Sequence, residues 1–469
     1  MSGLFYSLSA NSKALCAQAR GIETAGRNMA NVNNTSYSRQ RVEYGDRGSV
    51  VTTWGPESMG LEAMRITQLR DSLLDKQVLR EVSLRTSFET SQAGLQNAQA
   101  ALGEQISSAS GTDTSTSGSN GIATSLSEFF NSFQSFAANP TDVGERQTLI
   151  QRAGILADRI RLTDSRLSQV QSDLTTEVES DTSTVNTILQ NIADLNKQIA
   201  NLETTNHGCA LDLRDKRQAA LESLAEKVSF ETRPVGGETG EIQVYVHDTG
   251  GNEILLVDGR DVTNAVSFNG TTLQAGAAPV DIALTGGTIK GALDTRDGAV
   301  QTLRDNIDAL ASQLVTSVNA AYSPSGSDFF DSAGTTAATI TLDSGLTATT
   351  LKASNGGAAG DNDIALAVAA LASKTFSTAG GDDIDGTFSQ HYNGAVTNLG
   401  QELSGINSRL SDQESIESLV RSQRDAVSSV SLDEEAADLL KFQRAFQASS
   451  RVVQVIDSML DTLINGLGL

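Results

Sequence analysis

Both ends of this chain carry apolar stripes at helical spacing, and neither end has enough chain beside it to build a core of its own. Near the carboxyl end the apolar positions follow one another at alternating steps of three and four, interrupted only by Ser449. This heptad spacing is typical of a helix that packs lengthwise against another helix. The seam predicted at this end consists of Leu439, Phe442, Phe446, Val453, Ile456, Leu460 and Leu463.

A matching stripe near the amino end repeats at heptad spacing and continues into the next segment. It consists of Leu8, Leu15, Ile22, Met29 and Val32. Residues 1–47 hold six Lys and Arg against three acids, whereas residues 424–469 hold four against seven. Because the ends match in stripe and are opposite in charge, we expect them to pair as an α-helical coiled coil. Phe442 and Phe446 offer more apolar surface than one slim partner covers, so we expect them to face neighbouring subunits.

The composition excludes several classes of partner. A net charge of −23 argues against nucleic acid, whose binding depends on neutralising phosphates with Lys and Arg. No apolar run approaches the ~20 residues of a membrane span, and no cleavable signal peptide is expected at the start. Two cysteines cannot make a disulfide framework. Only five prolines occur, and none follows Pro324, which leaves room for long helices.

The periodicity along the chain predicts a nested organisation. Helices are expected over 3–31 and 67–107, separated by an extended or irregular stretch over 41–64. Asp142 and Glu145 predict the start of a helix of about 60 residues, roughly 90 Å long. Alternating strands take over after Pro234. Ser431, with Glu434 three residues later, predicts a helix cap where the last helix begins.

The expected fold is mainly α with a smaller β insertion. We expect an elongated, nested multi-domain subunit with paired terminal helices, a long-helix bundle domain and an outer β domain. The terminal coiled-coil assembly domain combines 1–45 with 425–469. The helical rod combines 46–232 with 288–322 and 388–424, the β insertion covers 233–287, and a second irregular or β insertion covers 323–387.

No combination of residues predicts catalysis or metal binding. His207 lies beside Cys209, but a structural metal site wants four ligands and no further His or Cys lies nearby. Two Asp-rich turns, at 361–363 and 382–386, lack the full spacing and the closing Glu of a calcium loop. We therefore expect no catalytic residue, no metal and no cofactor.

Motifs at both ends resemble those of the bacterial flagellar axial proteins, which are the rod, hook and hook-associated proteins. The first motif follows the amino-terminal helix and runs from Asn28 to Gln40, including Asn31, Tyr37 and Arg39. The second contains Asp433, Glu434, Glu435 and Asn465. Internal motifs at 71–80, 129–130, 139–140, 146–150 and 211–217 bring the chain nearest to the hook-associated branch.

This resemblance implies a structural component of the bacterial flagellum, not an enzyme. It implies self-association into a ring at the junction between hook and filament. The partners would be the hook protein and a second junction protein that leads to the filament. It also implies uncleaved export through the flagellar type III apparatus, with a chaperone on the C-terminal segment beforehand, and an extracellular location on the flagellum. The alternatives are another axial building block (hook, rod or filament protein) and a stalked adhesin or enzyme.

Overall fold

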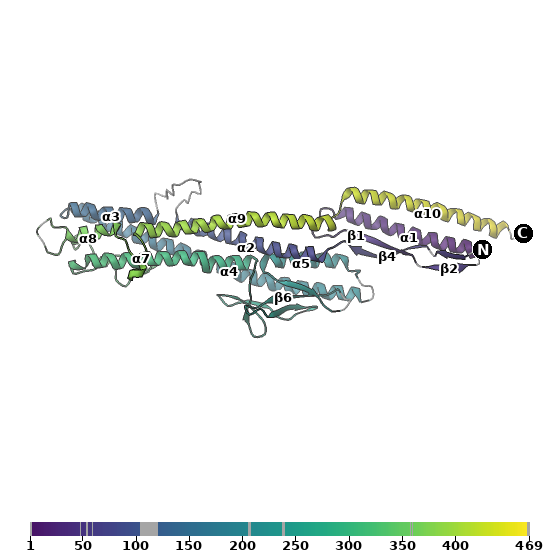
Figure 1. Ribbon diagram of the computed structural model, residues 1–469, viewed down its shortest axis with the longest axis horizontal. Coiled ribbons are helices and arrows are strands. Elements are labelled where there is room, and N and C mark those ends of the chain that lie inside the picture. Colours follow the sequence, from purple (N-terminus) through teal and green to yellow (C-terminus); the bar gives the residue numbers. More distant parts are fainter. Residues whose placement is uncertain are drawn as a thin grey trace.

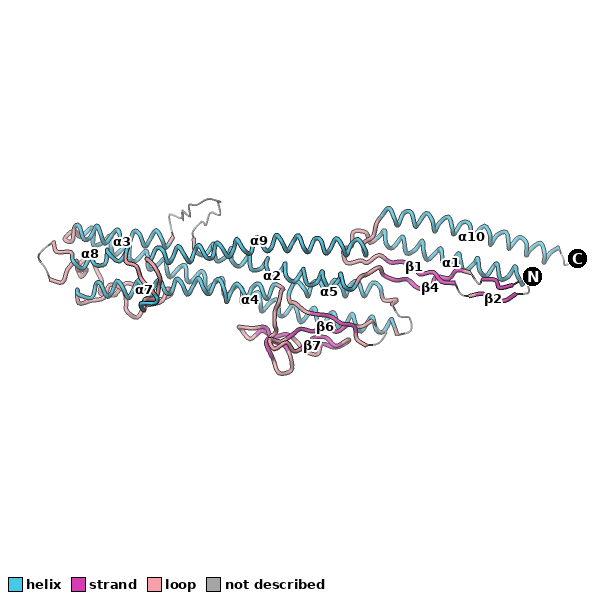
Figure 2. The backbone as a smooth tube through the Cα atoms, in the orientation of Figure 1, coloured by secondary structure: helices cyan, strands magenta, loops and turns pink. Residues whose placement is uncertain are grey.

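The computed structural model describes residues 2–46, 48–52, 55–58, 60–103, 121–204, 208–236, 240–356, 358 and 360–466. These residues form an elongated, mainly helical molecule with a smaller β region along one side (Figure 1, Figure 2). Both chain ends lie at the same end of the long axis (Figure 1). The predicted fold class, mainly α with a nested β insertion, is confirmed.

The two terminal helices lie side by side and are antiparallel. α1 (Ser2–Ala30) leads toward the middle of the molecule, and α10 (Leu432–Gly466) returns along it (Figure 1). The segment expected to be extended or irregular forms antiparallel pairs, which place a β-hairpin against α1. β1 (Gln40–Asp46) pairs with β4 (Leu61–Gln68), and β2 (Ser49–Thr52) pairs with β3 (Gly55–Ser58).

The first rod helix begins later than the sequence suggested. β4 continues to Gln68, and α2 (Ser72–Leu102) starts after Asp71, whose side chain accepts hydrogen bonds from the backbone N–H groups of Leu73 and Leu74. Satisfying these free N–H groups is what an N-cap does. The predicted start at residue 67 is therefore wrong by one short strand. The helix ends at Gly103, which adopts a left-handed conformation with φ 67°.

Long helices form the rod. α4 (Val143–Glu203) spans 61 residues and starts at the predicted Asp142, which accepts a hydrogen bond from the Gly144 N–H. It packs with α3 (Ile122–Ala138) at the outer end and with α5 (Leu211–Lys227) toward the terminal helices. α7 (Gln301–Tyr322) and α9 (Phe388–Ser428) complete the bundle. α9 ends just before α10, as the Ser431 signal predicted.

The β region is built on the side of α4. The strands β5 (Glu231–Pro234), β6 (Ile242–His247), β7 (Glu253–Asp258) and β8 (Asp261–Val262) form one antiparallel sheet in sequence order. A smaller sheet has the order β11 (Val280–Asp281), β10 (Leu273–Ala275), β9 (Val266–Phe268). α6 (Thr288–Asp294) and a π-helical turn (Thr295–Val300) then lead into α7.

Two apolar cores divide the rod lengthwise. The outer core joins α3, the start of α4, α7 and the start of α9, and Phe129 and Phe133 are completely buried in it. The segment 323–387, which contains α8 (Asp363–Ala370), contributes Phe329, Phe330 and Ile340 to the same core. The second core joins α2, the later half of α4, α5 and the β-sheet. The described part of 323–387 therefore caps the outer end of the bundle, with its pairing limited to isolated β-bridges.

Candidate assembly site

The two ends of the chain meet at a buried amide, that of Asn28 in α1. The Asn28 side chain is 1% exposed and makes four hydrogen bonds. Its Nδ2 donates to the carbonyl of Gln40 (2.9 Å) and to the carboxylate of Glu435 (3.0 Å). Its Oδ1 accepts from the Tyr37 hydroxyl (2.8 Å) and from the Gln40 N–H (3.0 Å). One asparagine thus ties α1, the following turn, β1 and α10 together.

Arg39 completes this junction from the other side of Glu435. Its Nε donates to Glu435 at 2.7 Å, and its Nη1 donates to Glu434. Its backbone N–H donates to the carbonyl of Ser428 at the end of α9 (2.8 Å). Glu435 is 2% exposed, and a buried carboxylate is costly unless it is paired and hydrogen-bonded. Arg39 and Asn28 supply both, so the Glu435 position fixes where α10 starts relative to α1 and α9.

Along their length the two helices approach closely at a glycine. A Cβ on Gly21 would lie 2.8 Å from the Phe442 ring and 2.7 Å from the Tyr44 hydroxyl oxygen. The rings of Tyr44 and Phe442 also pack against each other, with centroids 6.2 Å apart. Phe442 is therefore part of the contact between the chain's own ends. The expectation that it faces a neighbouring subunit is wrong, because β1 and α1 together cover a surface that a single helix would leave open.

The other predicted seam residues divide by burial. Ile456 and Leu460 are buried. Leu439, Val453 and Leu463 of α10 are half-buried, and so are Leu8, Leu15, Ile22, Met29 and Val32 of the amino end. Phe446 is 37% exposed. The closest packing on α1 uses the smaller residues Ala17, Gly21, Thr24 and Ala25, which are buried beside the predicted stripe.

α10 carries a second apolar face that the heptad spacing did not reveal. Val452, Val455 and Met459 are 43%, 51% and 51% exposed, and their spacing of three and four puts them on one side of the helix. This face is turned about a quarter to a third of a turn away from Ile456 and Leu460. Leu440, Phe446, Phe5 and Tyr6 add exposed apolar surface to the same terminal unit. A surface of this kind marks an interaction site more often than scattered apolar residues do.

A second buried cluster joins the terminal unit to the rod. Arg70 follows β4 and donates to the Ser38 hydroxyl (3.0 Å) and to the Asp215 carboxylate (2.8 Å) on α5. Asp75 of α2 lies 3.6 Å from Arg70. Burial raises the pKa of Asp215 to about 6, although Arg70 pulls in the opposite direction. Burial, and then the charge of Asp215, also raises the pKa of Tyr37.

The motif at 211–217 ties together the junction, the rod and the β region. Asp215 pairs with Arg70, while Arg214 pairs with Glu203 of α4 (2.7 Å). Arg217 donates to Asn196 and to the carbonyl of Gly240, both at 2.7 Å. One helical segment therefore faces three parts of the molecule. This explains why so many charged residues occur together at the start of α5.

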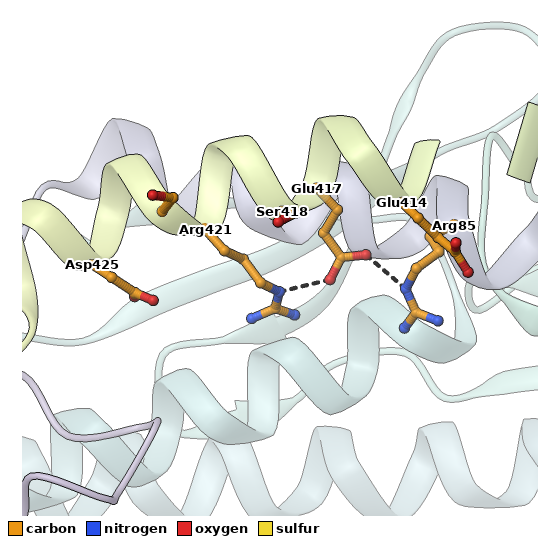
Figure 3. A pocket seen from close by; sticks show the side chains of 7 residues that line it. Arg85, Glu414, Glu417, Ser418, Arg421 and Asp425 are labelled. Carbon is orange, nitrogen blue, oxygen red and sulfur yellow. Dashed lines mark hydrogen bonds and ion pairs between the residues drawn. The ribbon is translucent and has the colours of Figure 1, made fainter. Parts of the chain in front are cut away.

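Charged pairs also hold α9 in place along α2 and α5 (Figure 3). Glu417 is 7% exposed and accepts from Arg85 of α2 and from Arg421, both at 2.6 Å. Arg421 and Arg424 reach Glu222 of α5 at 3.2 and 2.8 Å. These bonds line a shallow hollow, and they fix the lengthwise position of α9 because each pair has one partner on another helix.

Three predicted motif residues lie outside these clusters. Asn31 donates to the carbonyl of Arg27 within its own helix end, and Asn465 donates to Asp461. Asp433 is exposed at the start of α10. The Ser431 carbonyl accepts from the Glu435 N–H. Within the described residues, however, no hydrogen bond joins the Ser431 hydroxyl to Glu434, whose carboxylate is turned toward Arg39. The helix start was predicted correctly, but the cap was not.

The described residues offer little for chemistry. Over the described ranges, no three His, Cys, Asp or Glu side chains gather as they would to hold a metal ion. Both cysteines are free and exposed. His207 lies outside the described residues. None of the helices in the described segments is sufficiently long and apolar to span a membrane.

Comparisons with known proteins place this geometry in context. Residues 109–337 match the model of the helical domain of flagellar hook-associated protein FlgK, and residues 421–466 match the C-terminal model of flagellar basal body rod proteins. Flagellar hook-associated protein 1 of Bacillus subtilis is 25% identical, and the alignment covers 100% of this chain and 99% of that protein. The protein of the same name from Salmonella typhimurium is 22% identical, with 96% and 98% covered. A solved structure of the flagellar hook junction protein FlgK from Burkholderia pseudomallei is 21% identical with a TM-score of 0.46, over 55% of this chain and 46% of that one.

Proposed function

The chain belongs to the flagellar hook-associated protein 1 family and is a structural component of the bacterial flagellum rather than an enzyme, and we propose that it forms the ring that joins the hook to the filament. The observation that carries this proposal is the arrangement of the terminal unit. Its two ends are closed on each other by Asn28 and Glu435, while a second apolar face of α10 stays open. A unit that is internally complete and still apolar outside is suited to packing against copies of itself and against neighbours above and below.

In the proposed assembly, the open face of α10 packs against neighbouring subunits. Covering Val452, Val455 and Met459 removes apolar area from water, which stabilises an interface by roughly 25 cal/mol per Å² before the cost of association. The seam formed by Ile456 and Leu460 keeps the helix pair together in each subunit. The two faces thus have separate tasks, and variants can separate them.

The central test uses Val455→Asp in a strain that lacks the chromosomal copy. Val455 is 51% exposed, so the substitution leaves the packing within one chain intact while placing a charge in the proposed interface. We expect intact hooks without filaments, and filament subunits shed into the medium. Gln454→Asp, on an exposed position of the same turn that faces away, is the matched control and should support normal filaments.

Three results would contradict the proposal. Normal filaments on Val455→Asp cells would remove α10 from the interface. Short or absent hooks in the deletion strain would point to the alternative, a hook or rod building block. Antibody labelling of complete flagella should mark the hook–filament boundary, and labelling along the whole filament would indicate a filament protein.

The same open face bears on how the chain leaves the cell. We infer that a flagellar export chaperone covers the C-terminal segment before the uncleaved chain passes through the type III apparatus. Exposed Val452, Val455 and Met459 would otherwise favour premature association in the cytoplasm. Purification of the full chain from a strain without filaments should yield a bound small protein, and Val455→Asp should reduce its amount. Equal recovery with both chains would argue against a chaperone at this face.

A further inference from the structure

The rod has an apolar groove that lies away from the terminal unit. It runs between α2 and the strands β5 and β6 and has a volume of about 640 Å³. Leu73, which is 63% exposed, stands at its opening. The buried Ser83 hydroxyl, which lacks a hydrogen-bond partner within the described residues, belongs to the same wall. The main apolar lining is Leu73, Leu79, Leu84, Phe230, Tyr245 and Val246.

α9 carries an exposed apolar stripe on its own solvent side. Ile416, Leu419 and Val427 are 46%, 59% and 47% exposed. Steps of three and eight residues keep them on one face of the helix, because two turns take about seven residues. This face differs from the one that holds Glu417 and Arg421 against α2 and α5 (Figure 3).

The groove and the stripe lie at the same height along the rod. α2 leads away from the terminal unit and α9 returns toward it (Figure 1). Gln92 on α2 bonds to Asn407 (2.7 Å), and Glu81 bonds to Gln413 (2.7 Å). The segment 73–84 therefore lies level with roughly 413–427. α9 follows one edge of the rod and the β-sheet lies along the opposite edge, so the two surfaces face different sides (Figure 1).

The charges beside the two surfaces are complementary. The exposed charged residues of segment 73–84 are Lys76 and Arg80, both basic. Those of segment 412–427 are Asp412, Glu414 and Asp425, all acidic. Basic side chains of one copy would therefore meet acidic side chains of the next. Two grooves or two stripes would bring like charges together, which disfavours a symmetric pair.

We propose that the α9 stripe of one copy packs into the α2–β groove of a second copy. The inference rests on the proposed function, because it names the contact between subunits of that ring. A head-to-tail contact closes into a ring when the rotation between copies closes, and it requires two different surfaces on each subunit. Each copy offers one groove and one stripe at the same height, so a ring leaves neither uncovered. The Lys76 and Arg80 side chains then give the contact its direction.

The test is a disulfide between two kinds of copy assembled in one cell. Both native cysteines are replaced by serine, and two chains of different size are co-expressed, one with Leu419→Cys and one with Leu73→Cys. Oxidised, purified flagella should contain a heterodimer of the two sizes as a major band. Either single variant alone should give no dimer. Leu419→Cys with Glu89→Cys is the matched control, since Glu89 is exposed on α2 outside the groove, and it should give at least tenfold less heterodimer.

The outcomes separate the inference from the function on which it rests. Flagella that carry filaments and contain both chains but no heterodimer would overturn the inference alone. A Leu419–Leu419 dimer, or a disulfide to a different flagellar protein, would overturn it as well. Absence of the chain from purified hook–filament complexes would overturn the proposed function too. If the cysteine chains fail to assemble, carbodiimide treatment of wild-type flagella replaces them. A two-chain band with Lys76 joined to Asp412 or Glu414 supports the contact, and a band that lacks this link contradicts it.

Discussion

Asn28→Asp offers a severe test of the junction because it changes one buried group and almost no volume. The new carboxylate would stand 3.0 Å from the Glu435 carboxylate, where the amide now donates. At an effective dielectric of about 20, two charges at that distance repel by ~5.5 kcal/mol. Taking up one proton at pH 7 costs less, ~4 kcal/mol for an acid of ordinary pKa near 4, so the pair would share a proton. The lost donor to the Gln40 carbonyl adds ~1 kcal/mol.

The total expected cost is therefore ~5 kcal/mol at pH 7 and ~2.5 kcal/mol at pH 5. The direction follows from linkage, because a carboxyl whose folded-state pKa is raised destabilises most above that pKa and recovers as the pH falls. Hydrogen exchange of peptides from α1 and from the start of α10 measures this local opening. At pH 7 we expect protection to fall about a thousandfold, or to vanish, while peptides around Phe129 in the outer core keep theirs.

The control is the same substitution three residues later. Asn31 bonds only to a carbonyl of its own helix end on an exposed side, so Asn31→Asp should cost ~1 kcal/mol or less. If Asn28→Asp and Asn31→Asp reduce protection equally at pH 7, the proposed role of Asn28 is refuted. Loss of protection that does not diminish between pH 7 and pH 5 would refute the electrostatic part of the reasoning.

Three further predictions test other contacts. Gly21→Ala should weaken the α1–α10 pair by ~1–3 kcal/mol through overpacking, seen as faster exchange in α10, whereas Gly26→Ala, with open space around it, should be neutral or slightly stabilising. Asp215→Asn should flatten the decline in thermal stability that wild type shows as the pH rises from about 4 to 6, because the raised pKa of Asp215 makes its ionised form unfavourable; an unchanged pH profile would exclude this group. Arg217→Leu should leave the Gly240 carbonyl without this donor and speed proteolysis within the β region while α3 stays resistant, and equal resistance of both regions would contradict this.

Long periodic elements were predictable because their signal is local and repeated. The 61-residue α4 and its start at Asp142 follow from spacing and capping chemistry within one segment. The start of α2 was missed because residues 67–71 continue the same apolar spacing, while in the fold β4 extends to Gln68 and Asp71 supplies the cap. Strand pairing of β1 with β4 depends on a distant partner, and helical spacing alone gives no sign of it.

The site was predictable as a set of residues but not as an arrangement. The motif residues Asn28, Tyr37, Arg39 and Glu435 meet in one network, although their spacing gives no geometry. Gln40 was included only as the end of a motif, and Gly21 was overlooked because glycine carries no apolar signal. Phe442 was assigned outward because the sequence does not reveal that Tyr44 lies beside it. The domain boundaries and the assembly role of the seam stay predictions.

The closure of the chain on itself also sets an order of folding. Asn28 and Glu435 are 407 residues apart, so joining them in an unfolded chain costs ~5 kcal/mol of loop entropy. Once the rod has folded, the start of α2 and the end of α9 already lie side by side, and most of this cost has been met. The terminal pair should therefore be the last part of the molecule to form and the first to open. A subunit that emerges from a narrow channel can then build its rod before its ends commit to each other, and its neighbours meet those ends while they are still free to adjust.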